Sequence, residues 1–196
     1  METELHINPK TTAVIIIDLQ KGITAFPSQP HDVRKVIQNA VEILDVSRKL
    51  GMPIFLVHVA PSRDFKDALR PQSEKALSFG NLPEDWAEYV PELSVQTSDF
   101  QILKRQWGAF YGTELDLQLR RREIETIILL GISTNKGVES TARDAYERGY
   151  NQLFVEDAMS ARAPEEHFCS IKNVFPFLGK VCLTEEVVGA LKKIYS

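Results

Sequence analysis

The sequence predicts an α/β fold in which a six-stranded, mostly parallel sheet lies between two layers of helices. Short, continuous apolar runs rich in Val and Ile are typical of strands that are buried on both faces. Segments with apolar residues three to four positions apart indicate amphipathic helices. Because the two kinds of segment alternate, we expect right-handed crossovers and a three-layer α/β/α arrangement. The connections are too short to separate two cores, so residues 1–196 are expected to form one domain.

The strands are predicted from runs of β-branched and apolar residues. Residues 12–17 read TAVIII and stop at Asp18, and residues 53–59 read PIFLVHV. Both runs lack the alternation of a strand with one solvent-exposed face, so both are expected in the interior of the sheet. Four further strands are predicted over residues 100–103, 126–130, 152–155 and 180–183.

The helices are predicted from their capping residues and their apolar stripes. Asp32 is placed to cap a helix that extends to Gly51, a residue suited to a helix end. The segment Thr113-Glu-Leu-Asp116 has the capping-box form and predicts a second helix. Three further helices are predicted: residues 135–148, a helix opened by Pro164 that extends to about Val174, and a closing helix capped by Thr184.

Residues 60–99 form a long polar insertion between the second and third predicted strands. A connection of this length without regular structure is unusual in a compact domain. We therefore expect the insertion to serve as a lid over a binding site or as an oligomer surface.

The charge and the composition exclude several classes of function. The chain carries 23 Lys and Arg residues against 27 Asp and Glu residues, a formal net charge of −4. A mildly acidic surface does not attract nucleic-acid phosphates or anionic lipids, so neither partner is expected. The first residues lack the basic start and apolar run of a signal peptide, and no run is long enough to span a membrane.

The cysteines and histidines indicate neither a disulfide framework nor a metal site. Cys169 and Cys182 form no CxxC pair, which suits a reducing compartment, so a cytoplasmic protein is expected. In a helix or a strand, a cysteine is more often a small apolar residue than a nucleophile. The four histidines have no metal-binding spacing, so no metal is expected. The chain has no GxGxxG, Walker or GxSxG motif, and no cofactor is expected.

Three groups that can take part in chemistry follow the ends of predicted strands. Asp18 follows the first strand, Lys104 follows the third, and residues 131–137, GISTNKG, lead from the fourth strand into a helix. Ligands of open parallel sheets bind outside the carboxyl ends of the strands. We therefore expect a carboxylate, an ammonium group and free backbone N–H groups to meet in one crevice, as an acid–base pair beside an anion-stabilising site.

Each of these groups also has a structural interpretation. An Asp after a strand is most often a turn or cap former, and a single Lys is usually solvated. Thr134 and Asn135 are expected to cap the helix whether or not the site is catalytic. Gly137 indicates either a close approach of the backbone or tolerance of a poor helix former. The pattern leaves open whether Lys136 points into the crevice or away from it.

Three segments carry a family resemblance: TAVIIIDLQ near the start, KRQWGAFYGTELD in the middle and GISTNKGVESTARDAYERGYNQLFVEDAMSA later. Over nearly the whole chain the sequence resembles the isochorismatase-like hydrolase superfamily. The resemblance implies a Rossmann-like, isochorismatase-like fold and a small-molecule substrate. It also implies catalytic roles for Asp18 and Lys104, whereas Gly137 occupies the position of the third member of the family's triad, a cysteine.

The resemblance further implies a cis peptide bond at Ile132–Ser133. This bond would direct backbone N–H groups near Ser133 and Gly137 towards a developing oxyanion, so Ile132, Ser133 and Gly137 are the expected oxyanion site. Nicotinamidases of the family carry a DxH…H metal site after the second strand, whereas this chain reads HVAPSRDFKDALRP there. The resemblance therefore implies no metal ligands in this chain.

The glycine at position 137 affects the expected mechanism. Glycine has no nucleophilic atom, so a covalent acyl-enzyme and amide hydrolysis through it are disfavoured. True isochorismatases resemble this sequence in lacking the cysteine, and they protonate the vinyl carbon of an enol ether from the aspartate. By this resemblance Asp18 is the general acid, Lys104 orients it or holds a substrate oxygen, and Gly137 leaves room for substrate or water. A nearby ammonium lowers the pKa of Asp18, so an acid role requires that desolvation outweigh it.

A small carboxylated metabolite is the expected substrate. The residues expected to bind it are Gln20, Phe26, Arg63, Arg70, Trp107 and Phe110. Arg63 and Arg70 either clamp the carboxylate or form salt bridges within the insertion, and the aromatic residues either line the site or pack in the core.

Two other functions remain open at this stage. One is a metabolite-binding or assembly paralogue without activity, and the other is an amidohydrolase in which Asp18 activates water. A homodimer or a larger homo-oligomer is expected, because family members commonly associate and the insertion offers a surface.

Overall fold

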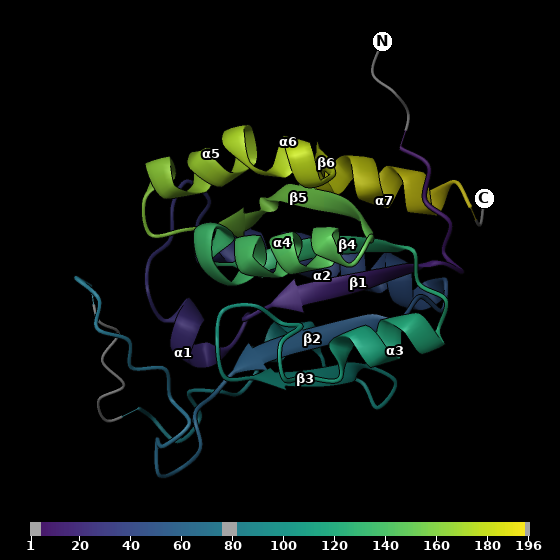
Figure 1. Ribbon diagram of the computed structural model, residues 1–196. Coiled ribbons are helices and arrows are strands. Elements are labelled where there is room, and N and C mark those ends of the chain that lie inside the picture. Colours follow the sequence, from purple (N-terminus) through teal and green to yellow (C-terminus); the bar gives the residue numbers. More distant parts are fainter. Residues whose placement is uncertain (1–4, 76–81, 195–196) are drawn as a thin grey trace.

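A six-stranded parallel sheet forms the centre of the protein (Figure 1). The computed structural model describes residues 5–75 and 82–194. The strands lie in the order β3-β2-β1-β4-β5-β6, and each pair of neighbours is parallel. Their bounds are β1 (Thr12–Ile17), β2 (Ile54–Val59), β3 (Phe100–Lys104), β4 (Thr126–Ile132), β5 (Asn151–Ser160) and β6 (Lys180–Cys182). This arrangement confirms the predicted α/β class and the six-stranded sheet.

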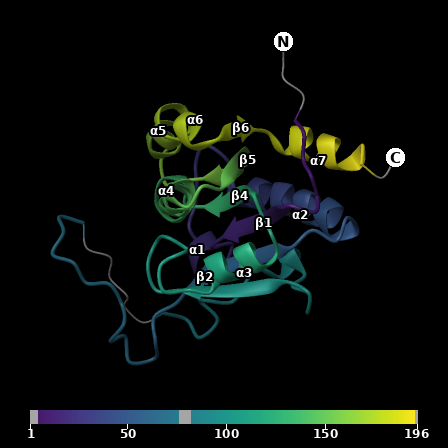
Figure 2. The ribbon, with the colours of Figure 1, turned by 45° about the vertical axis from the view of Figure 1, so that its right-hand side comes forward.

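Helices cover both faces of the sheet (Figures 1 and 2). One core cluster joins alternate residues of β1 to α2 and α7, and a second joins its remaining residues to α3, α4 and α6. β1 is therefore buried on both faces, which explains its unbroken run of Val and Ile residues. The helices are α1 (Lys21–Thr24), α2 (Val33–Lys49), α3 (Leu115–Arg121), α4 (Glu139–Glu147), α5 (Pro164–Asn173), α6 (Phe175–Leu178) and α7 (Thr184–Lys192).

The ends of α2 follow the predicted capping chemistry. The Asp32 carboxylate accepts a hydrogen bond from the backbone nitrogen of Arg34 at 2.9 Å, which satisfies one of the free N–H groups of the first turn. Gly51, just beyond the helix, has a φ of 67°, a conformation that glycine adopts without strain.

Several elements differ from their predicted bounds, among them α3, α4 and β5, and α1 and α6 were not predicted. α3 begins at Leu115, and Thr113 lies before it with its hydroxyl accepting a hydrogen bond from the Leu115 nitrogen. The helix predicted from residue 135 begins instead with a wider π turn, η2 (Thr134–Val138), which precedes α4. β5 continues to Ser160. A bulge interrupts its pairing with β4 after Phe154, and the pairing resumes at Met159.

The long insertion and α1 lie at the carboxyl ends of the strands, towards which the arrowheads in Figure 1 point. In its described part the insertion contains one short helical turn, η1 (Pro91–Leu93). The buried Gln20 amide fixes the later part of the insertion. Its nitrogen donates to the carbonyl oxygens of Val59 (3.1 Å) and Trp86 (3.2 Å), and its oxygen accepts from the Val59 nitrogen (2.9 Å). Through Gln20, the backbone of Trp86 is thus held close to the end of β2.

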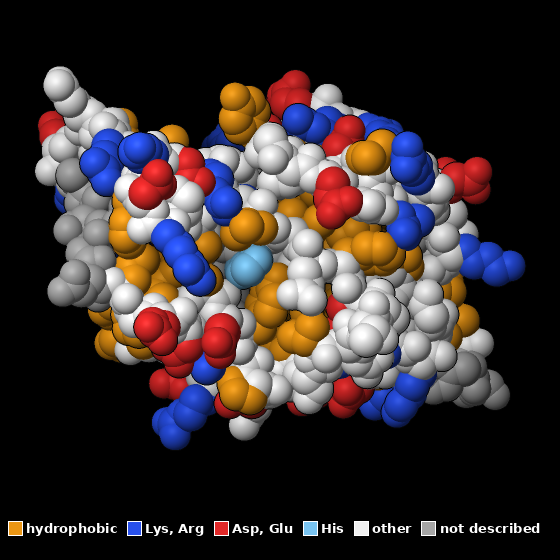
Figure 3. Space-filling model, turned by 90° about the horizontal axis from the view of Figure 1, so that it is seen from below, with side chains coloured by type: hydrophobic (Ala, Val, Ile, Leu, Met, Phe, Trp, Pro, Cys, Tyr) orange, Lys and Arg blue, Asp and Glu red, His pale blue; other side chains and the backbone are white. Residues whose placement is uncertain are grey.

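The surface at the β3 edge carries charges of both signs. Figure 3 shows Lys and Arg side chains mixed with Asp and Glu side chains on this face, with hydrophobic side chains between them. A mixed face of this kind does not produce a field of one sign. Among the described helices, none combines the length and the apolar character that a membrane span requires.

Candidate active site

Asp18 and Lys104 form a buried ion pair at the carboxyl ends of β1 and β3. The Lys104 Nζ atom lies 2.8 Å from Asp18 Oδ2 and also donates to the Trp107 carbonyl oxygen at 2.6 Å. Asp18 is 5% exposed and Lys104 is 1% exposed. β2 lies between the two strands, so these side chains meet across it at the same edge of the sheet. The expectation that the strand ends bring these two groups together is therefore met in the structure.

One oxygen of the Asp18 carboxylate is left without a partner. Among the described residues, Oδ1 is buried and accepts no hydrogen bond, whereas Oδ2 receives the Lys104 ammonium. Burial raises the pKa of Asp18, because desolvation penalises the charged form more than the nearby Lys104 charge and hydrogen bond favour it. The sequence did not show whether desolvation or Lys104 has the larger effect on the pKa of Asp18. In the structure desolvation has the larger effect, which favours the protonated carboxyl.

The backbone of Asp18 restricts which residues fit there. Its φ is 52°, in the left-handed region, where Asp and Asn are tolerated better than most other side chains. Gly131, on the neighbouring strand, has a φ of 122°, and a Cβ atom there would lie 2.1 Å from the Ile17 carbonyl oxygen. Glycine at this position therefore allows β4 to approach the end of β1 closely.

Gly137 lies directly beside the ion pair. A Cβ atom at this position would be 3.0 Å from Asp18 Oδ2, 3.2 Å from Lys104 Nζ and 2.8 Å from the Ile17 Cγ2 atom. The residue belongs to the π turn η2, which follows a cis peptide bond at Ile132–Ser133, the bond that the family resemblance implies. The structure thus brings position 137 to the acid and the lysine.

A cavity of about 300 Å³ opens beside these residues. Asp18, Lys104 and Gly137 line it, together with Ile132 and Ser133 of the expected oxyanion segment. Most of the remaining wall is apolar and is contributed by α1 and the following loop, the end of β2, the insertion and the segment after β3: Ile23, Phe26, Pro27, Val59, Leu69, Leu82, Trp86 and Trp107. A concave, mostly apolar site with a few convergent polar groups is typical of a small-molecule pocket.

Three cationic side chains that were not predicted to bind substrate also line the cavity: Arg105, Lys136 and Arg162. Arg105 is paired with Asp67 and donates to the Ala60 carbonyl oxygen at 2.7 Å. Lys136 is also among the residues that line the cavity, and its Nζ atom lies 3.7 Å from Glu166 Oε2.

Arg162 differs from the other two cations. Its guanidinium lies over the Phe26 ring, 4.8 Å from the ring centroid, and has no carboxylate partner among the described residues. Arg162 is exposed and lines the cavity, so its positive charge is available to a ligand there.

Two of the six expected substrate-binding residues, Phe26 and Trp107, line the cavity, and four do not. The Gln20 side chain is used to hold Val59 and Trp86, as described above. Phe110 is buried in the core and stacks on Tyr150, with ring centroids 5.9 Å apart. Arg63 and Arg70 are exposed in the insertion, and Arg70 donates to the Phe65 carbonyl oxygen. Their positions give no support to a carboxylate clamp at this cavity.

Neither cysteine of the chain lines the cavity. Cys182 is buried on β6, and desolvation raises the pKa of its thiol to about 12. Cys169 is exposed on α5. The cavity is thus walled by described residues that include no thiol.

A domain model described as the isochorismatase domain matches residues 12–186. The chain belongs to the isochorismatase family. One family relative, the uncharacterized isochorismatase family protein YwoC of Bacillus subtilis, is 48% identical over 98% of this chain and all of its own length. An isochorismatase family protein from Burkholderia thailandensis has a similar solved structure, with a TM-score of 0.92 and 40% identity over 97% of this chain and all of the other.

The isochorismatase family comprises hydrolases, and amidohydrolases are among the relatives of this chain. Ureidoacrylate amidohydrolase RutB of Caulobacter segnis is 30% identical over 96% of this chain and 89% of its own length. The six-stranded parallel sheet of this chain is therefore that of an isochorismatase-family α/β fold.

Proposed function

We propose that this protein hydrolyses a small carboxylated metabolite without a covalent cysteine intermediate, with Asp18 as the general acid. The observation that carries the proposal is the buried, unpartnered Oδ1 of Asp18 in a cavity wall beside Gly137. No described residue forms a hydrogen bond with this oxygen, so in our proposal it carries the proton that is transferred to the substrate. Hydrolysis of an enol ether needs an acid but no nucleophilic side chain, and it is the chemistry that the resemblance to isochorismatases implies.

The proposed reaction begins with transfer of the Asp18 proton to the vinyl carbon of the enol ether. The resulting oxocarbenium ion is captured by water, and the hemiketal collapses to a ketone and an alcohol. The proton released by the water returns to Asp18, so the carboxyl group is regenerated in each cycle. The ion pair with Lys104 holds the other carboxyl oxygen at 2.8 Å, which fixes the orientation of the acid and stabilises its conjugate base after transfer.

The raised pKa of Asp18 supports an acid rather than a base. An ordinary Asp has a pKa of about 3.9, so it is almost fully ionised near neutrality and is a poor proton donor. Burial increases the protonated fraction of Asp18 at any pH, and a bound substrate that excludes water adds to this effect. Ile132, Ser133 and Gly137 are the proposed neighbours of the oxygen that gains or loses charge during the reaction.

The position of Arg162 supports the proposal that the substrate carries a carboxylate. A guanidinium without a carboxylate partner, held over Phe26 in the cavity wall, can form a two-point contact with a planar carboxylate. This role replaces the one expected for Arg63 and Arg70. The apolar wall, which includes Trp107 and Trp86, suits the carbon skeleton of a small metabolite.

Amide hydrolysis is the second candidate, and the similarity to ureidoacrylate amidohydrolase RutB favours it. In this chain Gly137 provides no nucleophile, so water would have to attack the amide carbonyl with Asp18 as the base. That role needs ionised Asp18, which its burial opposes.

The experiment that tests the proposal compares the wild type with Asp18→Asn on a panel of enol ethers, amides and carbamoyl compounds, each carrying a carboxylate. Asn tolerates the left-handed backbone at this position but cannot donate an acidic proton. We expect the wild type to release an alcohol from the enol ether and Asp18→Asn to be slower by at least about 100-fold.

Asp45→Asn is the matched control, because Asp45 is exposed on α2 and the chemical change is the same. Its activity should equal that of the wild type. Circular dichroism should show that both variants are folded. Ammonia release from amides alone would establish the second candidate instead. A wild type that turns over no member of the panel while binding carboxylates would favour the paralogue without activity.

A further inference from the structure

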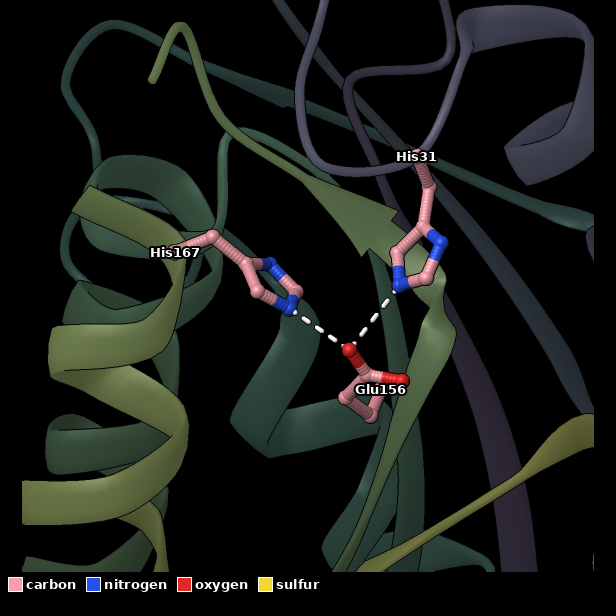
Figure 4. A group of neighbouring side chains, drawn as sticks. All are labelled: His31, Glu156 and His167. Atoms are coloured by element: carbon pink, nitrogen blue, oxygen red, sulfur yellow. Dashed lines mark hydrogen bonds and ion pairs between the residues drawn. The ribbon is translucent and has the colours of Figure 1, made fainter. Parts of the chain in front are cut away.

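Three ligand-type side chains from distant parts of the chain converge beside the cavity (Figure 4). His31 lies on the loop before α2, Glu156 on β5 and His167 on α5. The Nε2 atoms of both histidines lie 2.9 Å from the same oxygen, Glu156 Oε1. Figure 4 shows the two rings directed at the carboxylate from opposite elements. The histidines are 125 and 11 residues from Glu156, so no local spacing in the sequence indicates the cluster.

The donor set suits a divalent transition metal ion. One ligand atom from each residue lies within 4.8 Å of the other two. Two imidazole nitrogens and a carboxylate oxygen form a set that Zn²⁺ accepts, with bonds of about 2.0–2.2 Å and neighbouring ligand atoms roughly 3.3 Å apart. The two N···O separations of 2.9 Å are shorter than this spacing and the two nitrogens lie within 4.8 Å of each other, so rotation of the side chains is needed to admit an ion. Ca²⁺ and Mg²⁺ prefer oxygen ligands, so they match two imidazole nitrogens less well.

Burial and backbone geometry hold this cluster in place. The His167 side chain has no exposed surface, and those of Glu156 and His31 are 16% and 26% exposed. Glu156 lies in the part of β5 that bulges between Phe154 and Met159, where the pairing with β4 is interrupted. Of the three residues, His31 has the most contact with solvent.

A second layer of contacts orients the ligands. The Thr134 hydroxyl lies 2.8 Å from Nδ1 of His167, the ring nitrogen that faces away from Glu156. Metal-binding histidines almost always use their other nitrogen in such a hydrogen bond, which fixes the tautomer and the ring orientation. The carbonyl oxygen of His31 accepts hydrogen bonds from Ser28 and Ser160, each at 2.7 Å. The ligands are thus positioned before any ion binds.

The proton balance permits binding to neutral histidines. In the tautomer that carries the proton on Nε2, each histidine donates to Glu156, and Nδ1 of His167 accepts from the Thr134 hydroxyl. When an ion binds, the proton of each ring moves from Nε2 to Nδ1. His167 then donates to the Thr134 oxygen, and the partly exposed His31 donates to solvent. Two neutral imidazoles therefore become ligands without net loss of a proton.

We propose that His31, Glu156 and His167 form a binding site for one Zn²⁺ ion, with water as the fourth ligand. None of the three side chains lines the cavity, whereas Ser28, Ser133 and Ala161 near them do. The ion would join the loop around Ser28, β5 and α5, and would therefore stabilise one wall of the cavity rather than take part in the reaction. The proposal does not depend on the proposed hydrolysis.

The test uses the full-length chain carrying Cys169→Ser, which removes the exposed thiol as a competing ligand. The protein is stripped with a chelator and titrated with Zn²⁺ by calorimetry, and the bound metal is counted by mass spectrometry. We expect about one Zn²⁺ per chain, and an increase of the melting temperature on binding. Co²⁺ should give the visible absorption bands of a four-coordinate site.

Four variants in this background define the site. His31→Gln and Glu156→Gln should each weaken Zn²⁺ binding at least about tenfold and remove the Co²⁺ bands. Thr134→Val, which keeps the shape of the side chain, should weaken binding by about 10–100-fold through the ring orientation of His167. His6→Gln is the control, because His6 is exposed and lies outside the cluster, and it should bind as the parent does.

Two results would overturn the proposal. A stripped parent protein that binds neither Zn²⁺ nor Co²⁺ would show that the cluster is a hydrogen-bonded unit only. Binding that is unchanged in both His31→Gln and Glu156→Gln would place the ion elsewhere. Each variant is checked by its circular dichroism spectrum, so loss of binding is not confused with loss of the fold.

Discussion

The ammonium group of Lys104 holds one oxygen of the Asp18 carboxyl group, and no residue in the described part of the chain forms a hydrogen bond with the other oxygen. The two residues come from strands that are separated by β2, and both are almost completely buried. Removing two charges from water is costly, and the attraction between them offsets only part of that cost. A carboxyl group in this position is therefore closer to its neutral form than an exposed one, and this property leads to the first prediction.

The rate of enol ether hydrolysis is expected to fall as pH rises. A general acid must be protonated, so kcat/KM should be constant at low pH and then decrease by about tenfold per pH unit above the pKa of Asp18. Because burial raises this pKa, the decrease should begin above the pH at which an exposed Asp ionises. The measurement is kcat/KM over the pH range in which the protein stays folded. Activity that increases through this titration would identify Asp18 as a base.

Gly137→Ala is expected to destabilise the protein although Ala is the better helix former. The added Cβ atom would lie 2.8 Å from the Ile17 Cγ2 atom and within 3.2 Å of both charged groups, so the ion pair must shift. Overpacking of this kind costs about 1–3 kcal/mol, which exceeds the gain in helix propensity of about 1 kcal/mol. The free energy of unfolding, from denaturant titration, should fall by about 1–2 kcal/mol, and activity should fall with it.

Gly189→Ala is the matched control for this substitution. Gly189 lies within α7, and nothing lies within 4 Å of the position of its Cβ atom. The same chemical change should therefore stabilise the protein by about 0.5–1 kcal/mol. If both variants are stabilised, the contact between position 137 and the ion pair is looser than the distances indicate.

Arg162→Gln is expected to weaken the binding of carboxylated substrates. A hydrogen bond to a charged group contributes about 1.5–3 kcal/mol, which corresponds to an increase in KM of roughly 10- to 150-fold. kcat should change much less, because Arg162 contacts the proposed carboxylate rather than the reacting bond. Arg63→Gln, an exposed residue outside the cavity, is the control and should leave KM unchanged. Equal effects in the two variants would contradict the proposed role of Arg162.

The two thiols are expected to react at very different rates with a chromogenic disulfide reagent. Cys169 is exposed, whereas Cys182 is buried and its pKa is raised to about 12, so it forms almost no thiolate near neutrality. One equivalent of thiol per chain should react quickly in the folded protein, and the second only after denaturation. Cys169→Ser should abolish the fast phase. Two fast equivalents would show that β6 opens readily.

The parts of the site at strand ends could be predicted from the sequence because strand position determines side-chain position. Asp18 and Lys104 each end an apolar run, and parallel strands bring such ends to one edge of the sheet. Gly137 was found through the same rule and the family resemblance. None of these predictions depended on knowing the path that a loop takes.

Other parts of the site depend on contacts that no local pattern contains. Arg162 reaches the cavity because the bulge extends β5 to Ser160, whereas the apolar run predicts an end at residue 155. The orientation of Lys136 depends on Glu166, which α5 supplies. Arg63 and Arg70 lie in an insertion whose path is fixed by distant contacts, so their position relative to the cavity is not readable from spacing.

The hydrogen bonds of the Gln20 amide join the backbone of Trp86 to the end of β2. Trp86 closes one side of the cavity, and a Cβ atom on Gly22 would collide with its ring, so the indole is also held by close packing. Leu69, on an earlier stretch of the same insertion, is 53% exposed. Entry and exit of small molecules should therefore proceed by displacement of the stretch that carries Leu69, while the indole remains a stationary wall.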